Sequence, residues 1–167
     1  MEKKEYKTNF GIQSNTEDNK HIFMLDFDNK DERILINLLK HIQREFYISD
    51  LYIIKTENGF NVFSLDKLEM EYLVNILANY SAIDELFIAL AIKRGFFVLR
   101  MSGTDRQFYG IIPSLHNVYE KSLAHFRFFA DVKQYPINYY PNFDNNNEFK
   151  IIAFRSVKHG YETRQSI

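Results

Sequence analysis

The chain has 167 residues, 46% of them hydrophobic and 16% aromatic, which is enough to fill the core of one domain. Its formal net charge of −1 excludes the strong positive field that drives non-specific nucleic-acid binding, so any such contact must be local. The absence of cysteine excludes disulfides, thiolate metal sites and thiol nucleophiles. Neither a signal peptide nor a run of about 18 apolar residues occurs, so we expect a soluble, cytoplasmic protein with no membrane segment.

The first 20 residues are polar and predict a loose N-terminal arm, with at most a short edge strand near residues 7–12. Residues 21–29 then alternate in the manner of a strand. One face would carry Phe23, Leu25 and Phe27, and the other Met24, Asp26 and Asp28. Same-face positions of a strand lie roughly 7 Å apart, so Asp26 and Asp28 can converge on a divalent cation. They can equally be the polar end of a strand that runs into a turn.

Residues 31–46 predict a helix, because apolar side chains recur every three or four positions and acidic residues open the segment. The clearest hairpin follows, with strands over 51–55 and 60–63 around a turn at Glu57–Gly59. Ser64 is then expected to cap a second helix.

A third helix is expected to begin at Ser81 and to end before Gly95, with Leu86 and Leu90 in its buried stripe. A second hairpin follows, with strands over 96–101 and 107–112. In the first of these strands, Arg100 needs a carboxylate or a phosphate as partner.

The C-terminal third predicts a helix within 118–132, a loop over 134–147 and a last strand over 149–154. Strands and helices interleave without regular alternation, which indicates an α+β fold with a mostly antiparallel sheet and helices on one face. Asp26, Asp28, Asn61 and Arg100 would then share the open face. We expect a single domain over 1–167, with an arm (1–20), a core (20–112) and a C-terminal extension (113–167).

Three segments carry a resemblance to a known family. Leu25–Asp28 is similar to an apolar strand that ends in two metal-binding acids, and residues 55–63 to a hairpin that binds nucleotide phosphates. Residues 98–104 are similar to a strand and turn that read Leu-Arg-x-Pro-Gly-Thr in viral and plasmid members. In this order, the segments resemble the archaeo-eukaryotic primase-polymerase superfamily.

The resemblance implies an RRM-like or ferredoxin-like sheet and a DNA-replication protein that joins nucleotides on a DNA template. Magnesium or manganese would be held by the catalytic residues Asp26 and Asp28. The expected partners are nucleoside triphosphates, single-stranded DNA or a primer-template, and a replication protein. The nucleotide would be bound by Lys55, Thr56, Gly59, Asn61 and Arg100.

The chain departs from this family at three points. Asn61 stands where the family has a histidine, Ser102 replaces a proline, and the third acid has no clear match. An alternative is therefore a catalytically inactive relative that binds single-stranded nucleic acid or serves in assembly. The side chains available for this role would be Phe63, Tyr109, Arg100 and Arg106.

A third interpretation treats Asp26 and Asp28 as the nucleophile and acid of a phosphotransferase on a parallel sheet. The order of hairpins argues against such a sheet, and the threonine expected after the second aspartate is missing.

Overall fold

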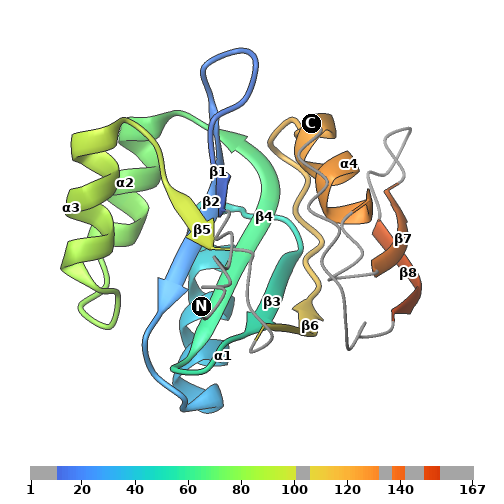
Figure 1. Cartoon of the computed structure of the whole chain (residues 1–167), viewed down its shortest axis with the longest axis horizontal. Coiled ribbons are helices and arrows are strands. Elements are labelled where there is room, and N and C mark those ends of the chain that lie inside the picture. The colour runs from blue at the N-terminus through green and yellow to red at the C-terminus, as the bar shows by residue number, and fades with distance from the viewer. Residues whose placement is uncertain (1–10, 101–105, 132–136, 142–148, 155–167) are drawn as a thin grey trace, which may run out of the picture.

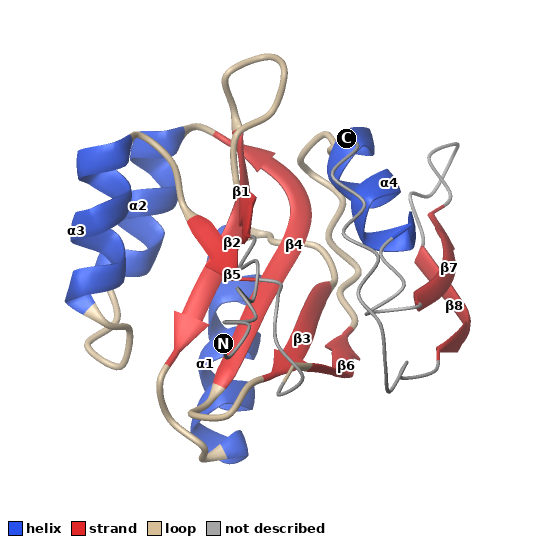
Figure 2. Ribbon diagram, viewed as in Figure 1, coloured by secondary structure: helices blue, strands red, loops and turns tan. Residues whose placement is uncertain are grey.

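The structure is a computed structural model that describes residues 11–100, 106–131, 137–141 and 149–154 (Figures 1 and 2). Its elements, in chain order, are β1 (Gly11–Gln13), β2 (His21–Phe27), α1 (Glu32–Phe46), β3 (Leu51–Lys55), β4 (Phe60–Leu68), α2 (Met70–Ala78), α3 (Glu85–Arg94), β5 (Val98–Arg100), β6 (Gln107–Ile112), α4 (Leu123–Asp131), β7 (Ile137–Pro141) and β8 (Phe149–Phe154).

The central sheet has four antiparallel strands in the order β2-β4-β3-β6. Two further antiparallel pairs, β1 with β5 and β7 with β8, form separate two-stranded sheets. The α+β prediction with an antiparallel sheet is therefore confirmed. The chain from β2 through α1 to β3 and β4 places β4 between β2 and β3, as a split β-α-β unit does. The fourth strand, β6, lies beside β3, so the RRM-like type is not confirmed.

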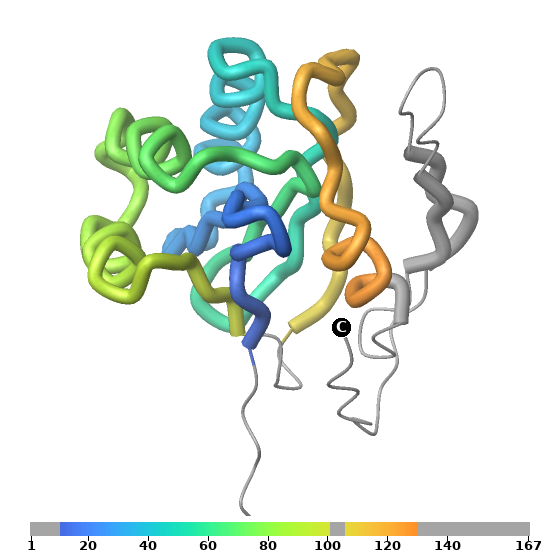
Figure 3. The backbone as a smooth tube through the Cα atoms, turned by 90° about the horizontal axis from the view of Figure 1, so that it is seen from above, coloured from blue at the N-terminus to red at the C-terminus, as the bar shows by residue number. Residues whose placement is uncertain are grey.

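Both faces of the central sheet are covered in part (Figure 3). The predicted helix over 31–46 is α1, which begins after Asp31 and covers one face with Leu35, Leu39 and Ile42. The Asp31 carboxylate accepts hydrogen bonds from the backbone N–H groups of Arg33 and Ile34 at 3.0 and 3.4 Å. This cap explains why the helix begins at its acidic residues, as the sequence predicted.

The second face is less open than the sequence indicated. The ring of Phe129, on α4, stacks on Phe63 of β4 with 3.8 Å between ring centroids, and Phe63 also stacks on Tyr52 of β3 at 5.1 Å. Large aromatic side chains on this face must be buried, and α4 supplies the cover. The β1–β5 pair lies over the same face, beside β2 (Figure 3).

The boundary between β4 and α2 differs from the prediction. Ser64 does not cap a helix, because β4 continues to Leu68. The last residues of β4 pair with the start of β2. Further contacts favour this extension: the carboxylate of Asp66 lies 2.7 Å from the ammonium of Lys121 and accepts hydrogen bonds from the backbone and hydroxyl of Ser49. These buried polar partners hold the segment extended, which local sequence patterns do not reveal.

The start of α3 also differs from the prediction. Its N-cap is Asp84, whose carboxylate accepts a hydrogen bond from the N–H of Leu86 at 2.9 Å, and not Ser81. The expected burial of Leu86 and Leu90 is wrong, since both are exposed, whereas Ala91 of the same predicted stripe is buried together with Ile88. The predicted end is confirmed, with Gly95 at φ 86° as C-cap.

The predicted second hairpin is wrong, because β5 pairs with β1 and β6 pairs with β3. The remaining elements follow the prediction in part. Strands β6 and β8 have the expected bounds, whereas β7 lies inside the segment predicted as loop. The turn at residues 102–105 and the first ten residues of the arm lie outside the described residues. Within the ranges that the structure covers, no helix has the length and apolar character needed to cross a membrane.

Candidate functional site

Asp26 lies near the end of β2, directly opposite Asn61 of β4. Residues paired in this way project to the same face of a sheet, and Ile54 of β3 continues the row. The Asn61 side chain is only 3% exposed, while Asp26 is half-buried. The structure therefore brings together two of the residues that the sequence placed on one face.

The electrostatic surroundings of Asp26 are unusual for an aspartate. The pKa of Asp26 is raised to about 6, first by burial and then by the negative charge of Asp28, just beyond the strand. The positive charge of Arg106 acts in the opposite direction, and the charge of Asp84 adds a smaller rise. The charges of a second carboxylate and of an arginine therefore both act on Asp26.

Arg106 was not among the metal- and nucleotide-binding residues predicted for this site. It is half-buried just before β6, and its Nε donates a hydrogen bond to the carbonyl oxygen of Arg100 at 2.7 Å. Arg100 ends β5 with an exposed side chain. The Arg106 side chain is therefore held at the end of β5, from where its positive charge acts on Asp26. The sequence named Arg106 only for the alternative role in nucleic-acid binding.

The hairpin turn predicted to bind phosphates is closed by its own polar groups. The hydroxyl of Thr56 accepts a hydrogen bond from the N–H of Gly59 at 3.1 Å, and the N–H of Thr56 donates to the carbonyl of Gly59 at 2.9 Å. Gly59 also packs against the end of β2, where a Cβ would collide with the carbonyl oxygen of Phe27. These groups hold the hairpin tip beside Asp26 and position the strand that carries Asn61.

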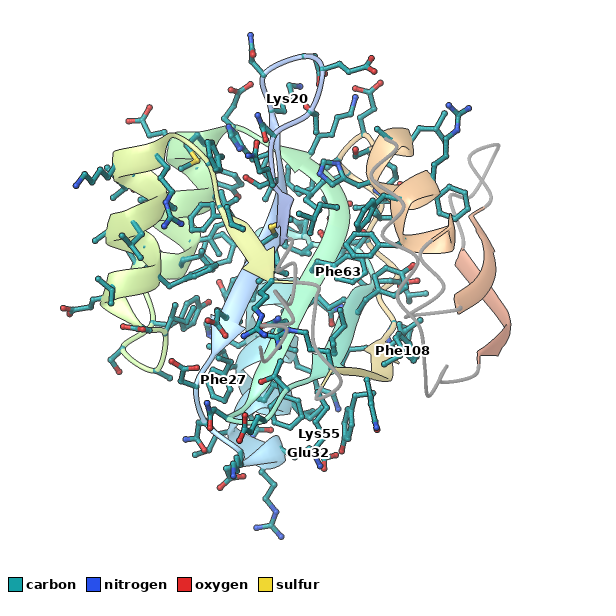
Figure 4. The ribbon with its side chains drawn as sticks, viewed as in Figure 1. Lys20, Phe27, Glu32, Lys55, Phe63 and Phe108 are labelled. Atoms are coloured by element: carbon teal, nitrogen blue, oxygen red, sulfur yellow. The ribbon has the colours of Figure 1, made fainter. Side chains whose placement is uncertain are left out.

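Lys55 lies on the opposite face from Asp26. It pairs with Phe60, and Phe60 pairs with Phe27, so this row alternates with the row that contains Asp26 and Asn61. Figure 4 shows Lys55, Phe27 and Glu32 toward the same end of the sheet. The structure thus separates Lys55 from the carboxylates.

The aromatic residues expected to stack on bases differ in access. Phe63 is fully buried between Phe129 and Tyr52, so its proposed role in stacking on bases is wrong. Tyr109, on β6, is 37% exposed and contacts Phe60 edge to face, with ring centroids 5.4 Å apart. A hydrogen bond to Glu32 raises the pKa of Tyr109 and fixes its position. Because more than a third of its surface is exposed, Tyr109 remains available to a ligand.

Among the residues that the structure describes, no group of three or more His, Asp or Glu side chains is placed to hold a metal ion. The chain matches no protein-family model, no curated protein and no solved structure. The resemblance to primase-polymerases therefore remains a prediction from the three segments.

Proposed function

We propose that the protein is an intracellular DNA-replication protein of the primase-polymerase type, which joins nucleotides with magnesium or manganese as cofactor. The observation that supports this most is the electrostatic interaction of Asp26 with Asp28, two positions further along at the end of β2, where the charge of Asp28 raises the pKa of Asp26. A divalent cation would relieve this repulsion, and carboxylate oxygens are the ligands that magnesium and manganese prefer. Asp26 and Asp28 would hold it.

When bound, the cation would activate a 3′ hydroxyl and neutralise the leaving pyrophosphate. The chain's own contribution is to bind and orient the nucleotide. We assign the triphosphate to Arg100 and Arg106, because the Arg106 side chain is held at the backbone of Arg100 and its positive charge acts on Asp26. In this arrangement, Thr56 and Gly59 support the site by fixing the hairpin.

The direct test is incorporation of labelled nucleotide on single-stranded DNA and on a primer-template, with magnesium or manganese. We expect Asp26→Asn and Asp28→Asn to abolish incorporation. Glu17→Gln is the matched control, since it removes an exposed carboxylate from the loop between β1 and β2. If the wild-type protein incorporates no nucleotide with any metal or template, the catalytic form of the proposal is wrong.

Cation binding provides a second measurement that does not need activity. Because protons compete for Asp26, manganese affinity should weaken as the pH falls through about 6. Asp26→Asn should remove both the affinity and its pH dependence, while Glu17→Gln should keep both.

The alternative is a module that binds single-stranded nucleic acid without chemistry. It is favoured by the hydrogen bonds between Thr56 and Gly59, which occupy groups expected to contact phosphates. In this role, Tyr109 would stack on a base and Arg106 would contact the backbone. Salt-sensitive binding that persists in Asp26→Asn but is lost in Tyr109→Ala would favour the binding module over the enzyme.

A further inference from the structure

Helix α3 lies on the outer flank of the molecule, and α2 packs beside it (Figures 1 and 3). Its inner side buries Ile88 and Ala91. The outer side is unusually apolar for a helix that faces solvent, since Leu86 is 62% exposed and Ile92 is 60% exposed. This outer side is independent of the candidate site on the sheet.

Five of the seven exposed residues of α3 form one stripe. At about 100° per residue, these five fall within about 60° of Ala89 around the helix axis, whereas Leu90 and Arg94 lie about 100° and 140° from it. We call this set the α3 stripe; its members are Glu85, Leu86, Ala89, Ile92 and Lys93, and all five are exposed.

The α3 stripe is symmetric about its centre. Leu86 and Ile92 lie three positions before and after Ala89, and Glu85 and Lys93 lie four positions before and after it. The small side chain of Ala89 permits close approach of another helix at the centre. The acidic start and the basic end make the stripe complementary to itself when a second copy runs antiparallel.

We propose that the α3 stripe is a docking surface for a second copy of this chain, with two α3 helices packed antiparallel about a two-fold axis near Ala89. Leu86 and Ile92 of each copy then flank the central contact at Ala89, one on each edge of the interface. Glu85 of each copy faces Lys93 of the other, which gives two equivalent ion pairs. Such an interface is isologous, as in most homodimers.

The dimensions of α3 determine the strength of this contact. Ten residues span about 15 Å of helix, which is shorter than a standard interface requires. The dimer is therefore weak and depends on concentration, with a Kd in the range of about 10 μM to about 1 mM.

The test is sedimentation equilibrium of the full chain over that concentration range. We expect Glu85→Lys to weaken self-association by about tenfold, because both ion pairs become repulsive. Lys93→Glu should weaken it similarly. Glu71→Lys is the matched control, since it makes the same charge change at an exposed position in the first turn of α2.

The decisive sample is an equimolar mixture of Glu85→Lys and Lys93→Glu. An antiparallel, two-fold arrangement brings opposite charges together at both ends of the mixed pair. A parallel pair would do the same, but like charges would already face each other in its wild type, so neither variant alone would weaken it. At one end the new positive charge of the first variant meets the new negative charge of the second, and at the other end the unchanged Lys93 meets the unchanged Glu85. The mixture should therefore form a heterodimer although each variant alone is weakened. Circular dichroism melts verify that both variants remain folded.

Three results would overturn the proposal. One is a wild-type protein that stays monomeric up to about 1 mM. Another is a dimer that Glu85→Lys and Leu86→Gln leave unchanged, which would place the contact elsewhere. The last is a mixture of the two charge variants that remains as weakly associated as its components.

Discussion

Gly59 joins the hairpin tip to the end of β2, and Gly59→Ala tests how tightly this junction is packed. A Cβ at this position would overlap the carbonyl oxygen of Phe27 and lie 2.9 Å from the backbone nitrogen of Asn29. Both neighbours are backbone atoms and cannot rotate away, so the strand ends must separate. Overpacking of this kind costs about 3 kcal/mol.

The separation would also weaken the two hydrogen bonds between Thr56 and Gly59, each of which contributes about 1 kcal/mol. We therefore expect Gly59→Ala to lower the free energy of unfolding by about 3–5 kcal/mol, measured by urea denaturation. Because Phe27 directly follows Asp26, the pKa of Asp26 should also return toward its usual value, which NMR titration would show.

Gly110→Ala is the matched control within the same sheet. A Cβ on Gly110 would meet no atom within 4 Å, so this substitution should be neutral or stabilise the protein by about 0.5–1 kcal/mol. Were Gly59→Ala to unfold within about 0.5 kcal/mol of the wild type, the close approach of hairpin and strand would be refuted.

Three further changes test other parts of the structure. Lys121→Met should cost about 3–5 kcal/mol in urea denaturation, because Asp66 would remain buried without its cation, and a cost near zero would exclude the pair. Phe129→Ala should cost about 3–5 kcal/mol and raise binding of a hydrophobic dye, since Phe63 loses its cover. For Asp26, the raised pKa means that the stabilising proton is fully bound below about pH 3.8 and is lost as the pH rises through about 6. Asp26→Asn should therefore gain about 2 kcal/mol relative to the wild type between pH 4 and pH 8 in thermal melts, allowing for partial exposure, and parallel pH profiles would contradict the assigned environment.

The sequence predicted the elements whose signals are local. The period of α1, its cap at Asp31 and the β3–β4 hairpin follow from neighbouring residues, and the structure has them at the expected positions. The continuation of β4 beyond Ser64 could not be predicted in this way. It depends on pairing with β2 and on Lys121, which lies 55 positions after Asp66 in the chain.

In the candidate site, too, local patterns predicted some features, whereas others depend on contacts between distant parts of the chain. Alternation along β2 placed Asp26 on a face, and hairpin geometry placed Asn61 near it, as the register confirms. The influence of Arg106 and Asp84 on Asp26 arises only when β6 and α3 are placed in space. Likewise, the period of α3 revealed an apolar stripe but not that Leu86 would face outward, because the direction of a helix depends on what packs against it.

The position of Asp26 is difficult to explain by folding alone. Burial and the negative charge of Asp28 both disfavour an ionised carboxylate at this position. The positive charge of Arg106 offsets only part of this penalty, since the pKa of Asp26 remains near 6. An asparagine or a threonine would fit the same strand without that repulsion. Structural ion pairs lower the pKa of an aspartate, whereas this one is raised, so the surroundings stabilise the proton more than the charge. A bound divalent cation, as proposed above, would offset this cost.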